Sequence, residues 1–282
     1  YHPIITRKVP WPSRMADASS DPVPVVETDL ASAQMIKYAS NAFLATRIAF
    51  IDEIAWLCEE AGADIKDVAL GMGYDPRIGH SYLQAGLGFG GPCLEKDLRA
   101  LVNHHERPGG GDGLLSAVLE HNEDQIARVV ARVRDLAGPL QGTTVAVFGL
   151  AFKAGTNDLR NSLALRVIAH LERERAVVRA YDPAAVATAR ALHPTLACFD
   201  NPYDAVRGAG ALVILTDWPQ FRTLDYRRIR GLMAKPCIVD PRNLLDAPTL
   251  ERLGFTYRGI GIKPAARRPA HGRPIRRAAR GS

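Results

Sequence analysis

The chain has 282 residues, of which 47% are hydrophobic and 23% are charged, a composition typical of a globular protein with room for two domains. No run approaches the roughly 18 apolar residues of a membrane-spanning helix, and the N-terminal segment lacks the apolar core of a secretion signal. The six arginines after Lys263 account for the whole net charge of +6, so the charges of residues 1–263 balance to zero. We therefore expect the folded part to bind neither membranes nor nucleic acid.

Four cysteines, none of them in a CxxC or another close metal-ligand spacing, are distributed along the chain. Four thiols in a chain of this size do not form a disulfide scaffold, so the sequence predicts no metal site and a reducing, cytoplasmic environment.

A long helix is predicted from about Leu30, because apolar residues recur three and four positions apart until Gly62 ends the pattern. Thr28 or Asp29 can cap it, and residues 1–28 form an irregular lead-in. A helix so long and apolar is expected to be buried on more than one side, within a helical domain or across a dimer interface.

Shorter helices are predicted around 64–72 and 95–106, and a second amphipathic helix over 114–137. After Gly138 the pattern changes to β-branched runs at 144–148, 177–181, 211–216 and 237–240, which alternate with helices. The predicted fold class is α + α/β. A helical dimerisation domain (29–137) precedes a Rossmann-like, doubly wound parallel sheet (138–263), and a basic disordered tail (264–282) follows.

The first candidate site is the segment 86–97, GLGFGGPCLEKD. Its four glycines would let the backbone approach a ligand closely and present N–H groups to it. Cys93 follows Pro92 at the start of a predicted helix, with Lys96 nearby, and this environment lowers a thiol pKa. Core packing remains the better interpretation of the other three cysteines, which lie in apolar runs. Cys93 is the predicted nucleophile.

Two further groups of polar residues suggest ligand contacts. Lys37 and Asn41 are four apart and share a helix face, where they could donate to a developing oxyanion or, for the lysine, simply reach solvent. The segment 149–160, GLAFKAGTNDLR, follows a strand and precedes a helix, so Lys153 and Arg160 could bind phosphate there. It lacks the GxGxxG pattern, which leaves Asp182, after the next strand, a weak candidate for a ribose contact. Arg242 ends a later strand at the same edge.

Three segments, KYASNAFLAT, GFGGPCLEKD and GLAFKAGTNDLRNS, resemble in order and separation the UDP-glucose/GDP-mannose dehydrogenases, and the resemblance covers residues 23–263. That family oxidises the C6 alcohol of a nucleotide sugar to a carboxylate with two NAD in succession. The resemblance implies that Cys93 forms a thiohemiacetal and then a thioester, that Lys37 and Asn41 stabilise the oxygen charge, and that Asp97 positions or activates the hydrolytic water.

The same resemblance implies the remaining contacts. The substrate would be bound by Tyr82, Leu83, Gln84, Phe89, Gly90, Lys153 and Arg242, and Lys96 and Arg160 would lie near the NAD pyrophosphate. Arg77 would reach a substrate held by the other subunit, which implies a homodimer.

One departure from the family pattern is the absence of a strand–GxGxxG–helix unit before Leu30, so we expect a fragment or a truncated reading frame that does not use NAD productively by itself. The leading hypothesis is the central and C-terminal part of a nucleotide-sugar 6-dehydrogenase with UDP-glucose favoured, while GDP-mannose and N-acetylated UDP-sugars remain open. The alternatives are a non-catalytic dimerisation and nucleotide-sugar-binding module and, from the basic tail, an RNA or lipid binder.

Overall fold

The computed structural model describes residues 25–105 and 113–262. The predicted tail and most of the predicted lead-in lie outside these ranges. The first half of the chain is helical, with α1 (Leu30–Ala61), α2 (Ile65–Gly73), α3 (Leu94–His105) and α4 (Leu114–Ala137). The Asp29 carboxylate caps α1 by accepting from Ser32 N at 2.9 Å, and Gly62 ends it with a positive φ of 70°. The long helix predicted from Leu30 to Gly62 is therefore present.

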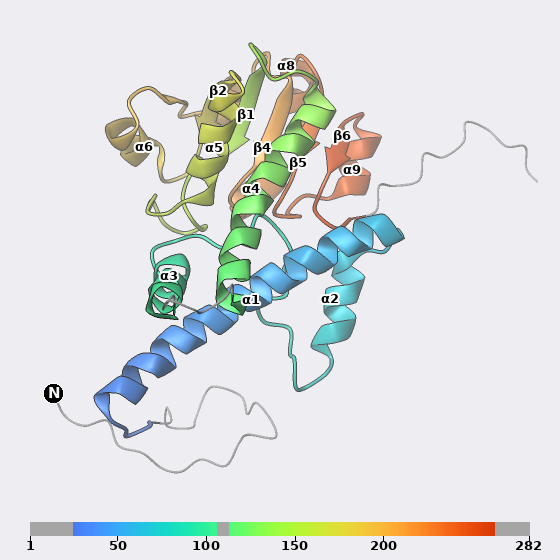
Figure 1. The fold of residues 1–282 in the computed structure, drawn as a ribbon. Helices are drawn as coiled ribbons and strands as arrows, with labels where there is room; N and C mark the ends of the chain where they lie inside the picture. Colours follow the sequence, from blue (N-terminus) through green and yellow to red (C-terminus); the bar gives the residue numbers. More distant parts are fainter. Residues whose placement is uncertain (1–24, 106–112, 263–282) are drawn as a thin grey trace, which may run out of the picture.

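The second half forms an open parallel sheet (Figure 1). Its strands are β1 (Thr144–Phe148), β2 (Val177–Tyr181), β3 (Ala197–Cys198), β4 (Ala211–Ile214), β5 (Cys237–Val239) and β6 (Thr256–Arg258). Their order is β3-β2-β1-β4-β5-β6, with every neighbouring pair parallel. This is the doubly wound order, in which the direction of winding changes between β1 and β4. The predicted fold class is confirmed, although β3 and β6 were not expected.

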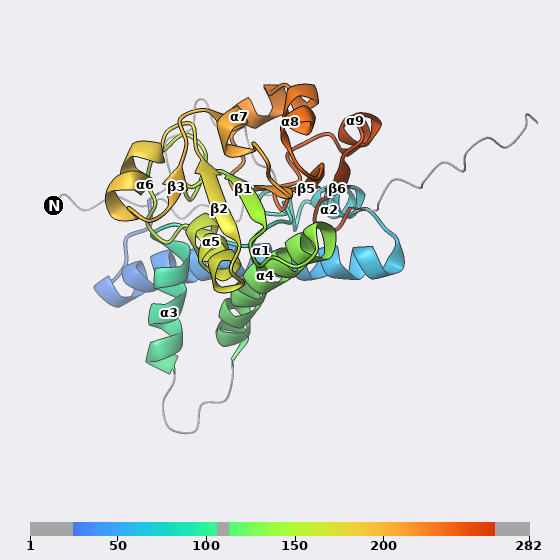
Figure 2. The same cartoon turned by 90° about the horizontal axis from the view of Figure 1, so that it is seen from above.

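Helices cover both faces of the sheet (Figure 2). On one side lie α4 and α5 (Leu163–Arg173), with α6 (Val186–Leu192) near the β3 edge. On the other lie α7 (Pro202–Ala205), the 3-10 turn η1 (Pro219–Thr223), α8 (Tyr226–Leu232) and α9 (Ala247–Arg252). Successive β1 side chains alternate between the two cores, since Val145 and Val147 face one and Ala146 and Phe148 the other. Both faces of the sheet are thus buried.

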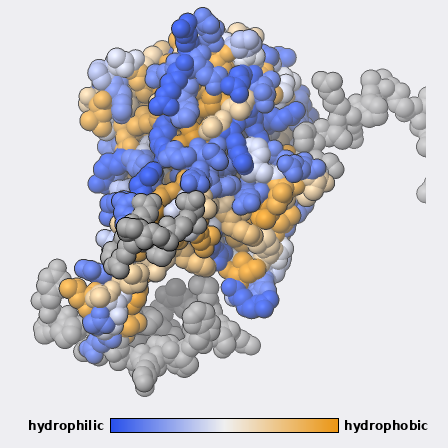
Figure 3. Space-filling view, viewed as in Figure 1, coloured by the Kyte–Doolittle hydropathy of each residue, from blue (hydrophilic) through white to orange (hydrophobic). Residues whose placement is uncertain are grey.

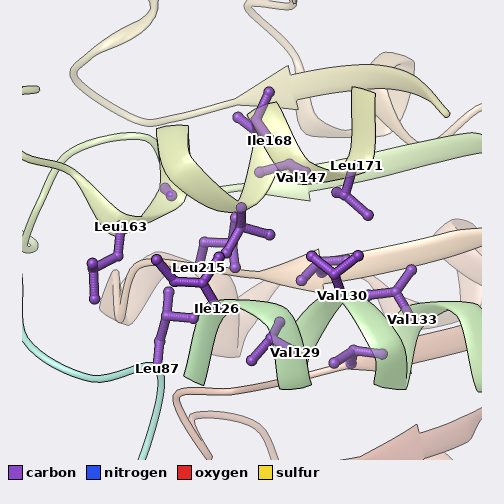
Figure 4. Close-up of a cluster of buried hydrophobic side chains, with 14 of the residues drawn as sticks. Leu87, Ile126, Val129, Val130, Val133, Val147, Leu163, Ile168, Leu171 and Leu215 are labelled. Carbon is purple, nitrogen blue, oxygen red and sulfur yellow. The ribbon is translucent and has the colours of Figure 1, made fainter. Parts of the chain in front are cut away.

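One core joins the helical half to the sheet. In Figure 4 the α4 side chains Ile126, Val130 and Val133 point toward α5 and the strands. The same cluster includes α1 side chains and Leu87 of the segment between α2 and α3. The C-terminal end is tied to α1 as well, because Gly261 N donates to the Glu59 carboxylate at 2.6 Å. The packing of α4 therefore fixes the helical half against the sheet.

The outer face of α1 has no cover from the described residues. Ile36, Phe43, Phe50 and Leu57 are 51%, 61%, 47% and 52% exposed, and they repeat every seven positions on one face of the helix. Figure 3 shows hydrophobic residues gathering on the lower half of the molecule, where α1 and α2 lie. Within this chain α1 is therefore buried along one side, by residues such as Ala45, Ile51 and Ala55, and not on several.

Candidate active site

The segment between α2 and α3 passes from the sheet edge to Cys93. It has no regular secondary structure, and every second side chain is buried, at Leu83, Ala85, Leu87 and Phe89. This period of two leaves the intervening positions, mostly glycines, on the opposite side of the backbone. We call residues 83–91 the substrate segment, because the family resemblance predicts substrate contacts for Leu83, Gln84, Phe89 and Gly90 within it.

Buried polar side chains of α1 and α4 hold the substrate segment from one side. Asp52 Oδ1 accepts from Gly86 N at 2.6 Å, and Gln125 Nε2 donates to Gly86 O at 2.9 Å. The Asn122 side chain bonds both backbone groups of Phe89, as the backbone of a neighbouring strand would. Its Oδ1 accepts from Phe89 N at 2.8 Å, and its Nδ2 donates to Phe89 O at 3.0 Å. Trp56 Nε1 donates to Gln125 Oε1 at 2.8 Å, which leaves Gln125 Nε2 facing Gly86.

The sheet half holds the segment from the other side. Gly91 N donates to Asn161 O at 2.9 Å and Asn161 Nδ2 donates to Gly91 O at 3.1 Å. A Cβ on Gly86 would lie 2.7 Å from Pro241 O, and one on Gly91 would lie 2.6 Å from the Phe152 ring. The glycine pattern predicts contact with a ligand. In the structure both halves of the chain also use Gly86 and Gly91 for close packing and for backbone hydrogen bonds.

Cys93 is exposed and free directly before α3, and its carbonyl oxygen accepts the first hydrogen bond of that helix from Asp97 N at 3.0 Å. Its thiolate would lie near two cations, because its charge contributes to raising the pKa of Lys96 and of Arg160. The larger causes are the hydrogen bonds of these two residues to Asp97 and Asp158, respectively. Burial raises the pKa of the thiols of Cys58, Cys198 and Cys237.

Asp97 contacts both predicted oxyanion donors, Lys37 and Asn41. Its fully buried carboxylate accepts from Asn41 Nδ2 at 2.7 Å and pairs with Lys37 Nζ at 3.4 Å and Lys96 Nζ at 2.8 Å. Burial acts to raise the pKa of Asp97, but the hydrogen bonds from Lys96 and Asn41 and the charge of Lys37 hold the pKa below its usual value. Both lysines are largely exposed, at 62% and 65%.

The first turn of α3 is also anchored to the sheet half. Glu95, nearly buried, accepts from Asn161 Nδ2 at 2.8 Å, Arg166 Nη1 at 3.1 Å and Arg99 Nη2 at 2.6 Å. Burial opposes its ionisation, but these donors hold the pKa of Glu95 below its usual value. Because Glu95 is two residues from Cys93, this network limits how far the thiol can move.

A pocket of about 480 Å³ opens where the substrate segment meets the sheet edge. Arg242 lies in it after β5, with Asp217 from the turn after β4, His80 and Gln84. Arg242 Nε donates to Leu215 O at 2.8 Å, while no ion pair within 4.0 Å holds its guanidinium among residues 25–105 and 113–262. Such a cation in a partly enclosed pocket is suited to an anionic ligand. Leu83 also lines this pocket.

Other predicted contact residues lie elsewhere. Phe89 is 3% exposed, and its side chain is enclosed in a small core with Ala42, Ala45, Ala49, Leu98 and Val118. A Cβ on Gly90 would lie 2.8 Å from Asn161 O. Tyr82 is 40% exposed with a positive φ of 60°, and Lys153 is exposed beside Phe152, with its Nζ 5.4 Å from the ring centroid.

The two remaining arginines are paired within their own turns. Arg77 is exposed and pairs with Asp75 at 2.6 Å, and Arg160 pairs with Asp158 at 2.7 Å. Neither guanidinium is therefore free of a counter-ion in this structure.

Asp182 does not fit a ribose contact. Its carboxylate is 2% exposed and accepts from the backbone N–H groups of Leu150, Ala151, Ala184 and Ala185 and from Trp218 Nε1, at 2.7 to 3.1 Å. These contacts occupy it and fix the turn after β1. The N–H groups of Leu150 and Ala151 are thereby withdrawn from any phosphate.

Sequence reasoning missed the residues that hold the substrate segment, namely Asp52, Asn122, Gln125 and Asn161. A signal for two of them is present in α4. Asn122 and Gln125 interrupt the apolar stripe that Val118, Ile126 and Val129 continue, and polar residues in such a stripe are expected to have internal partners.

An open α/β sheet with a pocket at the carboxyl ends of β4 and β5 has the arrangement in which proteins of this class bind ligands, nucleotides among them. A model of the UDP-glucose/GDP-mannose dehydrogenase family, central domain, matches residues 31–124, and a model of the UDP binding domain of that family matches residues 146–247. The chain belongs to this family.

Similar proteins agree with that assignment. UDP-glucose 6-dehydrogenase TuaD of Bacillus subtilis is 43% identical over 86% of this chain, and UDP-glucose 6-dehydrogenase of Pseudomonas aeruginosa is 47% identical over 81%. The chain spans 53% and 52% of those two proteins, about half of their length. A solved UDP-glucose dehydrogenase from Pyrobaculum islandicum is 34% identical with a TM-score of 0.75, over 86% of this chain and 54% of that one.

Replacing Asn122 by leucine should destabilise the protein, because both backbone groups of Phe89 would lose their buried partner. The expected loss in the free energy of unfolding is about 2–4 kcal/mol, measured by urea denaturation. Asn103→Leu, at an exposed position on α3, should change it by less than about 0.5 kcal/mol. Equal effects of the two substitutions would contradict the role given to Asn122.

Alkylation should separate Cys93 from the other thiols. With limiting iodoacetamide at neutral pH, peptide mass spectrometry should find Cys93 modified at least about tenfold faster than Cys58 and Cys237, which are buried and have raised pKa values. Cys93→Ser should remove the fast phase and leave the slow ones. Comparable rates at all three thiols would rule out a distinct environment for Cys93.

Proposed function

We propose that this chain supplies the nucleotide-sugar pocket and the catalytic thiol of a nucleotide-sugar 6-dehydrogenase, with UDP-glucose as the favoured substrate. The observation that carries the proposal is one continuous segment that joins a pocket containing Arg242 to the exposed Cys93. The match to a UDP binding domain and the names of the relatives favour a UDP-sugar.

Cys93 acts as the nucleophile in this proposal. Its thiolate attacks the C6 aldehyde derived from the sugar, so that a C–S bond forms and the carbonyl π electrons move to oxygen. Lys37 and Asn41, held together by Asp97, donate to that oxygen, and a proton completes the thiohemiacetal. After its oxidation to a thioester, attack by water releases the carboxylate and the free thiol.

Asp97 is better suited to positioning than to accepting a proton. A carboxylate whose pKa is lowered by two lysines and an amide is a weak base. We therefore propose that it orients Lys37, Asn41 and, through them, the hydrolytic water. Arg242 and Lys153 would bind the nucleotide, with Tyr82, Leu83 and Gln84 along the sugar and base and the backbone at Phe89 and Gly90 beside them.

NAD is the proposed cofactor, on the family resemblance, and would supply the hydride acceptor for the oxidations. The turn after β1 does not fit its pyrophosphate, because Asp182 occupies the N–H groups of Leu150 and Ala151. Lys96 and Arg160, both near Cys93, are the described cations that we propose to lie closest to the cofactor.

Binding and turnover test the proposal. By calorimetry the purified chain should bind UDP-glucose, and Arg242→Met should weaken binding at least about tenfold, since it removes a charge-assisted contact. Arg207→Met, at an exposed ion pair, is the matched control. Cys93→Ser should leave binding unchanged and abolish any formation of reduced cofactor with NAD.

Each outcome of that experiment separates the hypotheses. Turnover that depends on Cys93 supports the catalytic role. Tight binding with no turnover in the unmodified chain favours the non-catalytic dimerisation and nucleotide-sugar-binding module. An unmodified chain that does not bind UDP-glucose, UDP or GDP-mannose contradicts both.

A homodimer through α1 is also proposed, because the stripe of Ile36, Phe43, Phe50 and Leu57 is apolar and exposed. In a dimer, Arg77 of each copy would reach the substrate of the other. Light scattering should give twice the mass of 30.7 kDa, and Phe43→Glu should reduce it to one copy. Phe43→Leu should remain dimeric, and a monomeric unmodified chain would contradict the proposal.

A further inference from the structure

Asp52 is a buried acid that the proposed reaction does not use. It lies on the inner face of α1 with no exposed surface. Its Oδ1 accepts from Gly86 N at 2.6 Å, but its Oδ2 is buried and has no hydrogen-bond partner among the described residues. An unpaired carboxylate oxygen in such a place is costly, whereas a neutral carboxyl group is tolerated.

Asp52 is linked to the pocket through Gly86. The backbone of Gly86 is held between Asp52 and Gln125, and its α-carbon packs against Pro241 O, one residue before Arg242. Gly86 and Arg242 both line the pocket of about 480 Å³. A change in the charge or position of Asp52 can therefore alter the position of Arg242 through the contact between Gly86 and Pro241.

Among the charged and titratable side chains near this pair, Lys66, His80, Asp217 and Arg222 line the same pocket as Arg242. Desolvation raises the pKa of Asp52 to about 8, against the hydrogen bond from Gly86, the nearby amide of Gln125 and the charge of Arg242. Burial lowers the pKa of Arg242, and the carboxylates of Asp217, Asp52 and Asp240 oppose that effect. Near pH 7, Asp52 is thus neutral, and Arg242 is attracted by two neighbouring acids instead of three.

We propose that Asp52 is a positioning residue for the anionic ligand of this pocket: its neutral carboxyl group fixes Gly86 and leaves Arg242 free for the negative charge of the ligand. The inference rests on the proposed function, and it adds a proton-dependent control to the same site. When Asp52 loses its proton, its carboxylate competes with the ligand for Arg242.

The pH dependence of UDP-glucose binding tests this inference. If only the neutral form binds, the apparent Kd of the unmodified chain should rise about tenfold between pH 7 and pH 9, as the competent fraction falls through a pKa of about 8. Asp52→Asn keeps an acceptor for Gly86 N and cannot ionise. It should bind as well as the unmodified chain at pH 7, and its Kd should change less than twofold over the same range. Parallel pH profiles for the two proteins would overturn the inference.

Unfolding without ligand provides a second measurement. The folded-state pKa lies above the unfolded value of 3.8, so the stability contributed by Asp52 is full below about pH 4 and is lost as the pH rises through about 8. In urea, Asp52→Asn should therefore gain stability relative to the unmodified chain across that range. A constant difference would overturn the inference. If the unmodified chain binds no UDP-sugar but the difference follows pH, the proposed function fails while the neutral state of Asp52 stands.

Discussion

The site depends on the hydrogen bonds that hold the substrate segment between two halves of the chain. Gly86 is fixed by Asp52 and Gln125, Phe89 by Asn122, and Gly91 by Asn161. Because these backbone groups are buried, each would be costly without its partner. The path of the segment therefore determines the position of the pocket lining at one end and of Cys93 at the other.

The two buried carboxyl groups near this segment, those of Asp97 and Asp52, have different electrostatic environments. Near Cys93, Asp97 is ionised, since Asn41, Lys37 and Lys96 compensate its burial. At the other end, Asp52 Oδ2 has no hydrogen-bond partner among the described residues, and burial raises the pKa of Asp52 to about 8, which favours the neutral form that we propose. Two buried carboxyl groups in one site are thus assigned opposite charge states by their neighbours, which suits one to gathering cations and the other to leaving a cation free.

Local patterns predicted most of the fold. The apolar periodicity of α1 and α4, their terminal glycines and the β-branched runs of the central strands were sufficient. β3 has only two residues, and β6 (Thr256–Arg258) is not an apolar run, so neither showed a strand pattern. The four-residue spacing of Lys37 and Asn41 predicted a shared helix face, and in the structure both side chains contact Asp97. The role of Cys93 stays a prediction. It could not identify the partners of the glycines or of Asp182, because these contacts join residues far apart in the chain and depend on tertiary packing.

A crystal structure of this chain with UDP-glucose would show whether one segment connects an anion pocket to the thiol. We expect the diphosphate to lie beside the Arg242 guanidinium and the ligand to follow the substrate segment, with the C6 end of the sugar directed toward Cys93 Sγ. Ligand bound away from the segment, or with the sugar directed away from Cys93, would contradict this expectation.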